Sequence, residues 1–473
     1  MTTIKKTLFL ILLSILVITR CSFGPKHVTP MVETPADYRF SEVAQPDTIV
    51  NLAWWELFKD PTLDTLVQTA LTNNKDIGIA SSRIEEARAF LGFSKADQYP
   101  RLDIQAGGSR GNFVQGLALE SESQNFFISP VVNWELDFWG KYRKASEAAK
   151  AEYLASQLSY RSLQISLISE VASTYFILLD VKNRLEITRK TLKLREESLH
   201  IITRRFEEGI IPEIDVFQAR IQREIAAAAI PTFQRFIGQT ENSLSILLGK
   251  LPHSFDTADS IGLDAKPPEI PAGLPSDLLS RRPDIAEAEM LLKAQTARIG
   301  VAQALRLPSF NLTAALGFAS SELSQITDGD PVWSLTGSLS GPIFNFNKNV
   351  RLVEVEEARA QQALLNYENI VLVAFREVED ALLEISTYRD QLESKKRELA
   401  ASQNAARLSR SRYDKGVSSY LEVLETERNL FSVELEYSDL RKQYNNSYVR
   451  LYKALGGGWI TPEERDREES QID

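Results

Sequence analysis

Apolar and small or polar side chains alternate along four short stretches of the chain, at about 101–110, 126–137, 309–319 and 332–341. A period of two residues is typical of β-strands whose two faces differ. The pattern therefore predicts four strands of about ten residues each. Polar loops around ALESESQN and SSELSQITDGD are expected to connect the strands of each pair.

The polar face of these strands is made mainly of small residues such as Ser, Thr and Asn. Such a face suits a wet lumen, and Trp134, Trp139 and Trp333 lie near strand ends, as in the aromatic girdles of membrane barrels. An ordinary half-buried sheet of a soluble domain is the alternative. Because four strands cannot hide their edges in lipid, a membrane role requires a cyclic oligomer, and three chains would give a twelve-stranded barrel.

Two very long helices are predicted at 141–208 and 348–415, since neither range contains proline and both are rich in Ala, Leu, Glu and Arg. At 1.5 Å per residue each would be roughly 100 Å long and would need helical partners along its length. Return helices at 213–248 and 420–455 are the expected antiparallel partners. Gly209 and Gly416 fall at the breaks, where a left-handed residue can turn the chain at a hairpin tip.

Sequence matches at an offset of about 208 residues indicate an internal duplication. NKDIGIA matches RPDIAEA, QYPRL matches RLPSF, and SEVASTYF matches REVEDALL. The predicted organisation is a segment at 21–59, a first repeat at 60–250, a connector at 251–274, a second repeat at 275–457 and a polar tail at 458–473. Each repeat reads as a helix, two strands, a long helix and a return helix.

The first 20 residues resemble a signal peptide, because Lys5 and Lys6 precede a short apolar run from Leu8 to Ile18. Cys21 follows directly, at the place where a bacterial lipoprotein carries its lipid. Arg20 departs from the small residue that usually precedes such a cysteine. We expect Cys21 to be lipidated, the alternative being a free thiol in a tail.

Composition argues against several functional classes. The net charge of −10 argues against nucleic-acid binding. One Cys and three scattered His give no metal or disulfide site, and no phosphate-binding loop, nucleophile elbow or HExxH motif is present. We therefore expect no catalytic residues, no cofactor and no enzymatic activity.

The chain resembles the outer-membrane factors of tripartite efflux pumps in CSFGPKHVTP, DPTLDTLVQTALTNNKDIGIA, RRPDIAEAE, IGVAQALRLPSFNLTAALG and YDKGVSSYLEVLETER. The resemblance covers nearly the whole chain after the signal peptide. It implies a homotrimer in the outer membrane of a Gram-negative bacterium, with a shared β-barrel and a periplasmic α-helical barrel. It also implies two partners, a periplasmic adaptor (membrane fusion) protein and a proton-driven inner-membrane pump.

The resemblance also assigns roles around the second hairpin tip. It places Glu422 and Glu425 in a periplasmic ring of acids, with Asp215 as a further pore-lining candidate, and makes Tyr413 a latch residue; Ser418 stands where a latch arginine can occur. The tips at Gly209, Gly416 and Ser418 would be the surface that docks the adaptor. Glu422 and Glu425, at i and i+3, share one helix face. Alternatively, Ser419 and Glu422 form a capping box and Glu425 pairs with Arg428 on a solvated face.

The function expected from these features is a passive exit duct for small toxic compounds or metal ions. A duct of a protein-secretion system and a soluble periplasmic coiled-coil scaffold are the alternatives. The alternating strands and their tryptophans speak against the scaffold.

Overall fold

The computed structural model describes residues 23–40, 58–114, 117–257 and 275–457, which fall into two compact units. Of the described residues, the strand unit comprises 23–32, 82–114, 117–157 and 287–369. The hairpin unit comprises 33–40, 58–81, 158–257, 275–286 and 370–457. The predicted signal peptide, Cys21 and the C-terminal tail lie outside the described residues, as does most of the connector.

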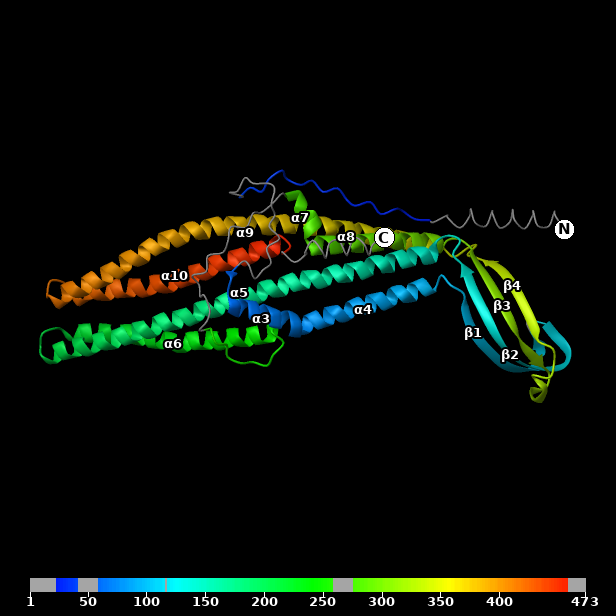
Figure 1. The fold of residues 1–473 in the computed structure, drawn as a ribbon, viewed down its shortest axis with the longest axis horizontal. Coiled ribbons are helices and arrows are strands. Elements are labelled where there is room, and N and C mark those ends of the chain that lie inside the picture. The colour runs from blue at the N-terminus through cyan, green and yellow to red at the C-terminus, as the bar shows by residue number, and fades with distance from the viewer. Residues whose placement is uncertain (1–22, 41–57, 115–116, 258–274, 458–473) are drawn as a thin grey trace. The chain divides into compact units, whose positions relative to one another are not determined.

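The same series of elements occurs twice along the chain (Figure 1). A pair of helices is followed by a strand pair, a long helix and a return helix. The first series is α3 (Pro61–Asn73), α4 (Lys75–Ala96), β1 (Arg101–Val114), β2 (Leu117–Leu136), α5 (Lys141–Glu207) and α6 (Glu213–Leu247). The second is α7 (Pro275–Arg281), α8 (Pro283–Ala304), β3 (Ser309–Ser320), β4 (Val332–Ser340), α9 (Lys348–Asp414) and α10 (Tyr420–Ala454), with a short 3₁₀ turn at Leu323–Gln325. Both long helices have 67 residues and both return helices have 35. The fold is thus mainly α-helical with a small sheet, as the sequence predicted.

Both helical hairpins turn through the same backbone motif. Gly209 (φ 72°) and Gly416 (φ 73°) adopt the left-handed conformation directly after the long helices. Around Gly209, its own N–H donates to the Phe206 carbonyl and the next N–H donates to the Arg205 carbonyl. The same two hydrogen bonds recur around Gly416. They pair carbonyls that the end of a helix otherwise leaves open, and glycine is required because a Cβ disfavours this φ.

The strand unit contains one antiparallel sheet in the order β1-β2-β3-β4. Strands β2 and β3 pair directly, so the two repeats share one sheet. The first strand pair differs from the expectation, because β2 begins at Leu117 and includes the residues ALESESQN that were predicted to form a loop. The hydrogen bonds of an antiparallel strand pair are made by the backbone and do not require apolar side chains. This polar stretch therefore still pairs with β1. The loop between β3 and β4 is present and spans 321–331.

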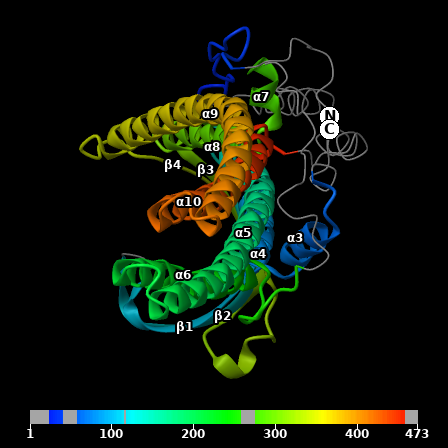
Figure 2. The ribbon, with the colours of Figure 1, turned by 90° about the vertical axis from the view of Figure 1, so that its left-hand side faces the viewer.

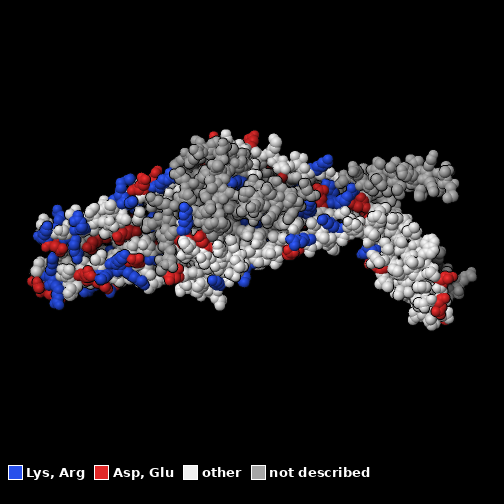
Figure 3. Space-filling model, in the orientation of Figure 1, with Lys and Arg blue, Asp and Glu red and all other residues white. Residues whose placement is uncertain are grey.

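The register of the sheet sets apolar residues opposite one another on one face. Val132 pairs with Leu102 on one side and with Ala314 on the other, and Ala314 pairs with Leu335. The next rows on this face are Trp134–Leu312, Leu136–Phe310–Leu339 and Leu316–Trp333. Small polar residues share the other face, as in the row Asn133–Thr313–Thr336. Figure 3 shows few charges over the strands.

Equivalent contacts occur within each of the two halves of the hairpin unit. Asn74 caps α4 with its side-chain oxygen, and its amide donates to the Leu247 carbonyl at the end of α6 (2.9 Å). In the second repeat, the buried Arg282 donates to the Ala454 carbonyl at the end of α10 (2.9 Å) and pairs with Glu377 (2.7 Å). The duplication therefore extends to individual contacts, although the residue types differ.

Helix α5 contains a stretch apolar enough to cross a membrane by length and composition. More than half of that stretch, 56%, is buried inside the protein. Packing within the helical layers explains its composition, because a helix covered on several sides needs apolar residues around most of its circumference.

Candidate functional site: the hairpin tips and the apolar face of the sheet

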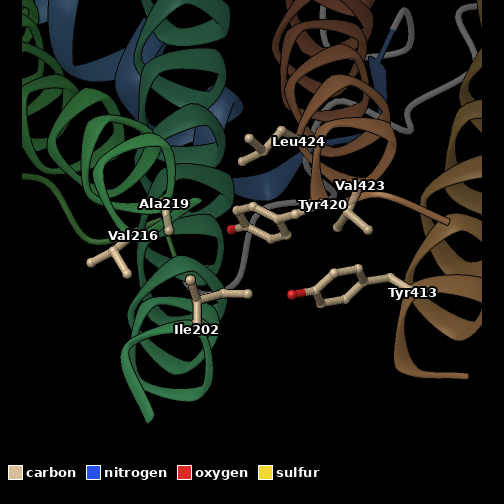
Figure 4. Packing of buried hydrophobic residues seen from close by; sticks show 7 residues of the cluster. All are labelled: Ile202, Val216, Ala219, Tyr413, Tyr420, Val423 and Leu424. Carbon is tan, nitrogen blue, oxygen red and sulfur yellow. The ribbon is translucent and has the colours of Figure 1, made fainter. Parts of the chain in front are cut away.

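The tips of the two hairpins meet in an apolar cluster. Figure 2 shows α5 beside α6 and α9 beside α10 as two hairpins. Tyr413 and Tyr420 project from the second hairpin toward Ile202, Val216 and Ala219 of the first (Figure 4). All five side chains are buried, together with Val423 and Leu424. Burial removes the apolar surface of these side chains from water, so the cluster stabilises the packing of the first hairpin against the second.

Tyr413 lies at the centre of the contacts between the tips. Its ring is 5.4 Å from that of Tyr420, and the Arg205 guanidinium of α5 lies over it at 4.9 Å. Arg205 also pairs with Asp414, with 3.6 Å between the nitrogen and the carboxylate oxygen. The Tyr413 hydroxyl is buried, and within the described part of the chain it has no hydrogen-bond partner. The contact between the hairpins at this point is therefore cation–π and ionic in character.

Glu422 and Glu425, the predicted ring acids, each have an arginine partner within the chain. Glu422 pairs with Arg412 of α9 at 3.2 Å, and Glu425 pairs with Arg428 at 2.5 Å. All four side chains are at least 40% exposed, so these pairs contribute little to stability. The pairing of Glu425 with Arg428 is the contact that the alternative interpretation expected.

The remaining predicted residues also lie at the tips. Ser419 is the N-cap of α10 but makes no side-chain cap hydrogen bond, so the alternative capping box does not form. The Ser418 hydroxyl is buried and has no partner among the described residues. Asp215 is half-buried in the first turn of α6, and burial raises its pKa. The structure thus brings Asp215 and Tyr413 to the tip seam and leaves Glu422 and Glu425 on its exposed rim.

A group of charged residues that sequence reasoning missed lies farther from the tips. Arg195 of α5 is only 3% exposed, and it donates to the Gln222 carbonyl of α6 at 2.7 Å. Glu427 of α10 pairs with Arg410 of α9 at 3.4 Å. Burial raises the pKa of Glu427, and Arg410 and Arg195 only partly oppose that effect. The position of Arg195 carried part of this signal, since it follows the buried Thr188 by seven residues and the buried Leu185 by ten on α5.

The tips of the hairpins carry many charges of both signs (Figure 3). No cluster of three or more His, Cys, Asp or Glu side chains suited to a metal ion occurs among the described residues. The local chemistry is therefore that of ion pairs and apolar contacts.

The apolar face of the sheet is the second feature with functional meaning. Leu102, Ile104, Leu316, Trp333 and Leu335 are all exposed on it. A contiguous exposed apolar face of this kind marks a membrane or protein contact. The outer strands β1 and β4 each have one neighbour in the sheet, so each presents an unpaired edge.

The predicted tryptophans lie near both ends of the strands. Trp134 precedes the end of β2 and donates its indole N–H to the Gln98 carbonyl at 3.1 Å, whereas Trp333 is close to the start of β4. Trp139 follows β2, donates to the Pro308 carbonyl and contacts the Phe23 ring. Phe23 also donates its backbone N–H to the Trp139 carbonyl, which fixes the chain two residues after Cys21 at the junction of sheet and helix.

Comparison with known proteins is consistent with this architecture. The model of the family described as "Outer membrane efflux protein" matches residues 66–250 and 274–457. The toluene efflux pump outer membrane protein TtgC of Pseudomonas putida is 35% identical, over 96% of each chain. The cation efflux system protein CusC of Escherichia coli O6:H1 is 35% identical, over 94% of this chain and 97% of CusC. The MtrE outer membrane channel of Neisseria gonorrhoeae, solved in its open state, superposes with a TM-score of 0.83 at 30% identity, covering 93% of this chain and 98% of MtrE.

The chain belongs to the outer membrane efflux protein family. It is an outer-membrane component of a Gram-negative efflux pump, and its family is one of transport channels rather than of enzymes. The resemblance drawn from the sequence is thereby confirmed, as are the predicted function in efflux and the outer-membrane location.

Proposed function

We propose that three copies of this chain form the outer-membrane duct of a tripartite efflux pump. The observation that carries the proposal is the four-stranded sheet with one exposed apolar face and two unpaired edges. Lipid offers no hydrogen bonds to an open edge, so the sheet must close with other sheets. Three copies of four strands give twelve, within the range of outer-membrane barrels.

A second surface supports the assembly. The exposed side of α6 carries an apolar stripe of Ile214, Phe217, Ile221 and Ile225, each about half exposed. Their spacing of three and four residues places them on one helix face. In a trimer this stripe would lie against a helix of the neighbouring chain, which would close the helical hairpins into a tube.

The hairpin tips form the periplasmic entrance of the proposed duct. Three-fold symmetry would collect six carboxylates from Glu422 and Glu425 around one axis, where they would attract cations. Both already pair with arginines, so opening or closing would exchange those partners. Asp215 and Tyr413 would hold the closed tips together, and the turns at Gly209, Gly416 and Ser418 would dock the adaptor protein.

The proposed cargo is small toxic compounds or metal cations, delivered by an inner-membrane pump through the adaptor. Among the relatives, TtgC is named for toluene and CusC for cations. The duct itself would be passive, with a proton-driven pump supplying the energy. Lipidation of Cys21 would add an anchor, because Phe23 is held at the junction of the strands and α5.

The test is the mass and conductance of the full chain purified from separated outer membranes. We expect a detergent-solubilised trimer that forms channels in planar lipid bilayers. A soluble monomer or dimer that forms no channels would disprove the proposal and revive the scaffold interpretation.

A further inference from the structure

One arginine contacts both hairpins of the chain at once. The Arg195 guanidinium of α5 donates to the Gln222 carbonyl of α6 at 2.7 Å, which ties together the two helices of the first hairpin. The same group lies over the Phe431 ring of α10, 5.0 Å from its centre, and so reaches the second hairpin. The side chain is almost completely buried. Arginine suits such a position because its planar group can donate and stack at the same time.

The charge of Arg195 has a counterpart in Glu427. This carboxylate interacts electrostatically with Arg195 of the first hairpin and pairs with Arg410 of its own hairpin. The Tyr420 hydroxyl also interacts electrostatically with Glu427 and with Asp215 of α6. Each of the four helices therefore contributes a charged or titratable group: Arg195 from α5, Asp215 from α6, Arg410 from α9, and Glu427 with Tyr420 from α10.

Separation of the hairpins would break these contacts together. Arg195 would lose the Phe431 face and the Glu427 charge, while its hydrogen bond to Gln222 lies within the first hairpin and could persist. Separation would cost the cation–π contact with Phe431 and the attraction between the Arg195 and Glu427 charges. The contacts of Arg195 with the second hairpin thus resist opening.

We propose that Arg195 is a positioning residue that couples the two helical hairpins of each chain, so that the entrance opens only when Arg195 leaves Phe431 and Glu427. This inference rests on the proposed duct and adds a regulatory residue to it. The contacts of Arg195 lie within one chain, whereas the proposed acidic ring would be formed by Glu422 and Glu425 of three chains.

A specific pH signature follows from the position of Glu427. Burial raises its pKa in the closed arrangement, and separation of the hairpins would return it toward the ordinary value. The closed state then binds the proton more tightly, so acidification favours closure and rising pH favours opening. Loss of Arg195 removes a cation near Glu427 and should raise its pKa further. The midpoint of the pH profile should then move to higher pH.

The experiment compares Arg195→Met with a matched control, Arg223→Met, in the full-length trimer in planar bilayers. Arg223 joins α6 to Glu196 of α5 and so ties the first hairpin alone. We expect the open-to-closed ratio at pH 7 to rise at least tenfold in Arg195→Met, about 1.4 kcal/mol. The pH midpoint should move upward in the same variant. Arg223→Met should match the wild type in both readouts.

Two further variants keep the test decisive if Arg195→Met fails to assemble. Arg195→Lys retains the charge but not the planar face, and Phe431→Leu retains an apolar side chain but not the ring. Both should give intermediate open-to-closed ratios. Wild-type ratios and pH profiles in the assembled Arg195 variants would overturn the inference while leaving the duct intact. A wild-type chain that forms no channel would instead refute the proposed function.

Discussion

A single charge on the apolar face of the sheet should prevent membrane assembly, whereas the same charge on the other face should be tolerated. Leu335 lies within the nine-residue strand β4, pairs with Ala314 and is 71% exposed in the isolated chain. Its neighbour Ser334 pairs with Ala315 and points to the polar face. We therefore compare Leu335→Arg with Ser334→Arg, which add the same charge one residue apart.

The magnitude follows from the cost of placing a cation against lipid. Arginine on the lipid face of a barrel costs about 2–4 kcal/mol near the middle of the bilayer and much less near its surfaces. A trimer repeats the substitution three times, so the penalty reaches about 6–12 kcal/mol if Leu335 is near the middle. Arginine at Ser334 would face the lumen, where water can solvate it.

The assay is fractionation of outer membranes followed by size-exclusion chromatography with light scattering. Leu335→Arg should be depleted from the outer membrane and should lack the trimer peak, and Ser334→Arg should resemble the wild type. Equal behaviour of the two variants would show that the apolar face does not contact lipid. The assignment of the faces, and with it the proposed barrel, would then be wrong.

Three further predictions concern individual residues of the hairpin unit. Arg282→Ala should destabilise the protein by about 1–3 kcal/mol, because it leaves the Ala454 carbonyl without its donor and the partly exposed Glu377 without its partner; calorimetry would check this, and an unchanged melting temperature would contradict it. Gly209→Ala should cost about 1–2 kcal/mol because of its left-handed φ, whereas Gly238→Ala inside α6 should be neutral or stabilising in the same thermal denaturation. Glutamine at both Glu422 and Glu425 should weaken the block of single-channel current by divalent or trivalent cations at least tenfold; undiminished block would remove both residues from the pore.

Much of the fold could be predicted from local sequence. The absence of proline from 141–208 and 348–415, with glycine after each range, locates two long helices to within one residue of the observed ends. These features are local because backbone hydrogen bonds in a helix span four residues and a tip glycine acts through its own φ. The same local reasoning failed for ALESESQN, where composition suggested a loop and pairing with β1 produced a strand.

The candidate site was predictable only in part. Glu422, Glu425, Asp215 and Tyr413 were chosen through the resemblance, and the structure places all four at or beside the tips. Sequence could not choose between a pore ring and a surface pair for Glu425, because Arg428 is three residues away in either case. The roles of these residues in an open or closed duct remain predictions.

By itself, the sequence determined the duplication, the lengths of the long helices, the hairpin tips and the two faces of the strands. Each depends on periodicity or on one residue acting on its own backbone. Only the tertiary structure decided that Arg195 meets Phe431 and Glu427, more than 230 positions later in the chain. Such a meeting depends on the register in which two hairpins pack, which is set by many apolar contacts together and leaves no local pattern in the sequence.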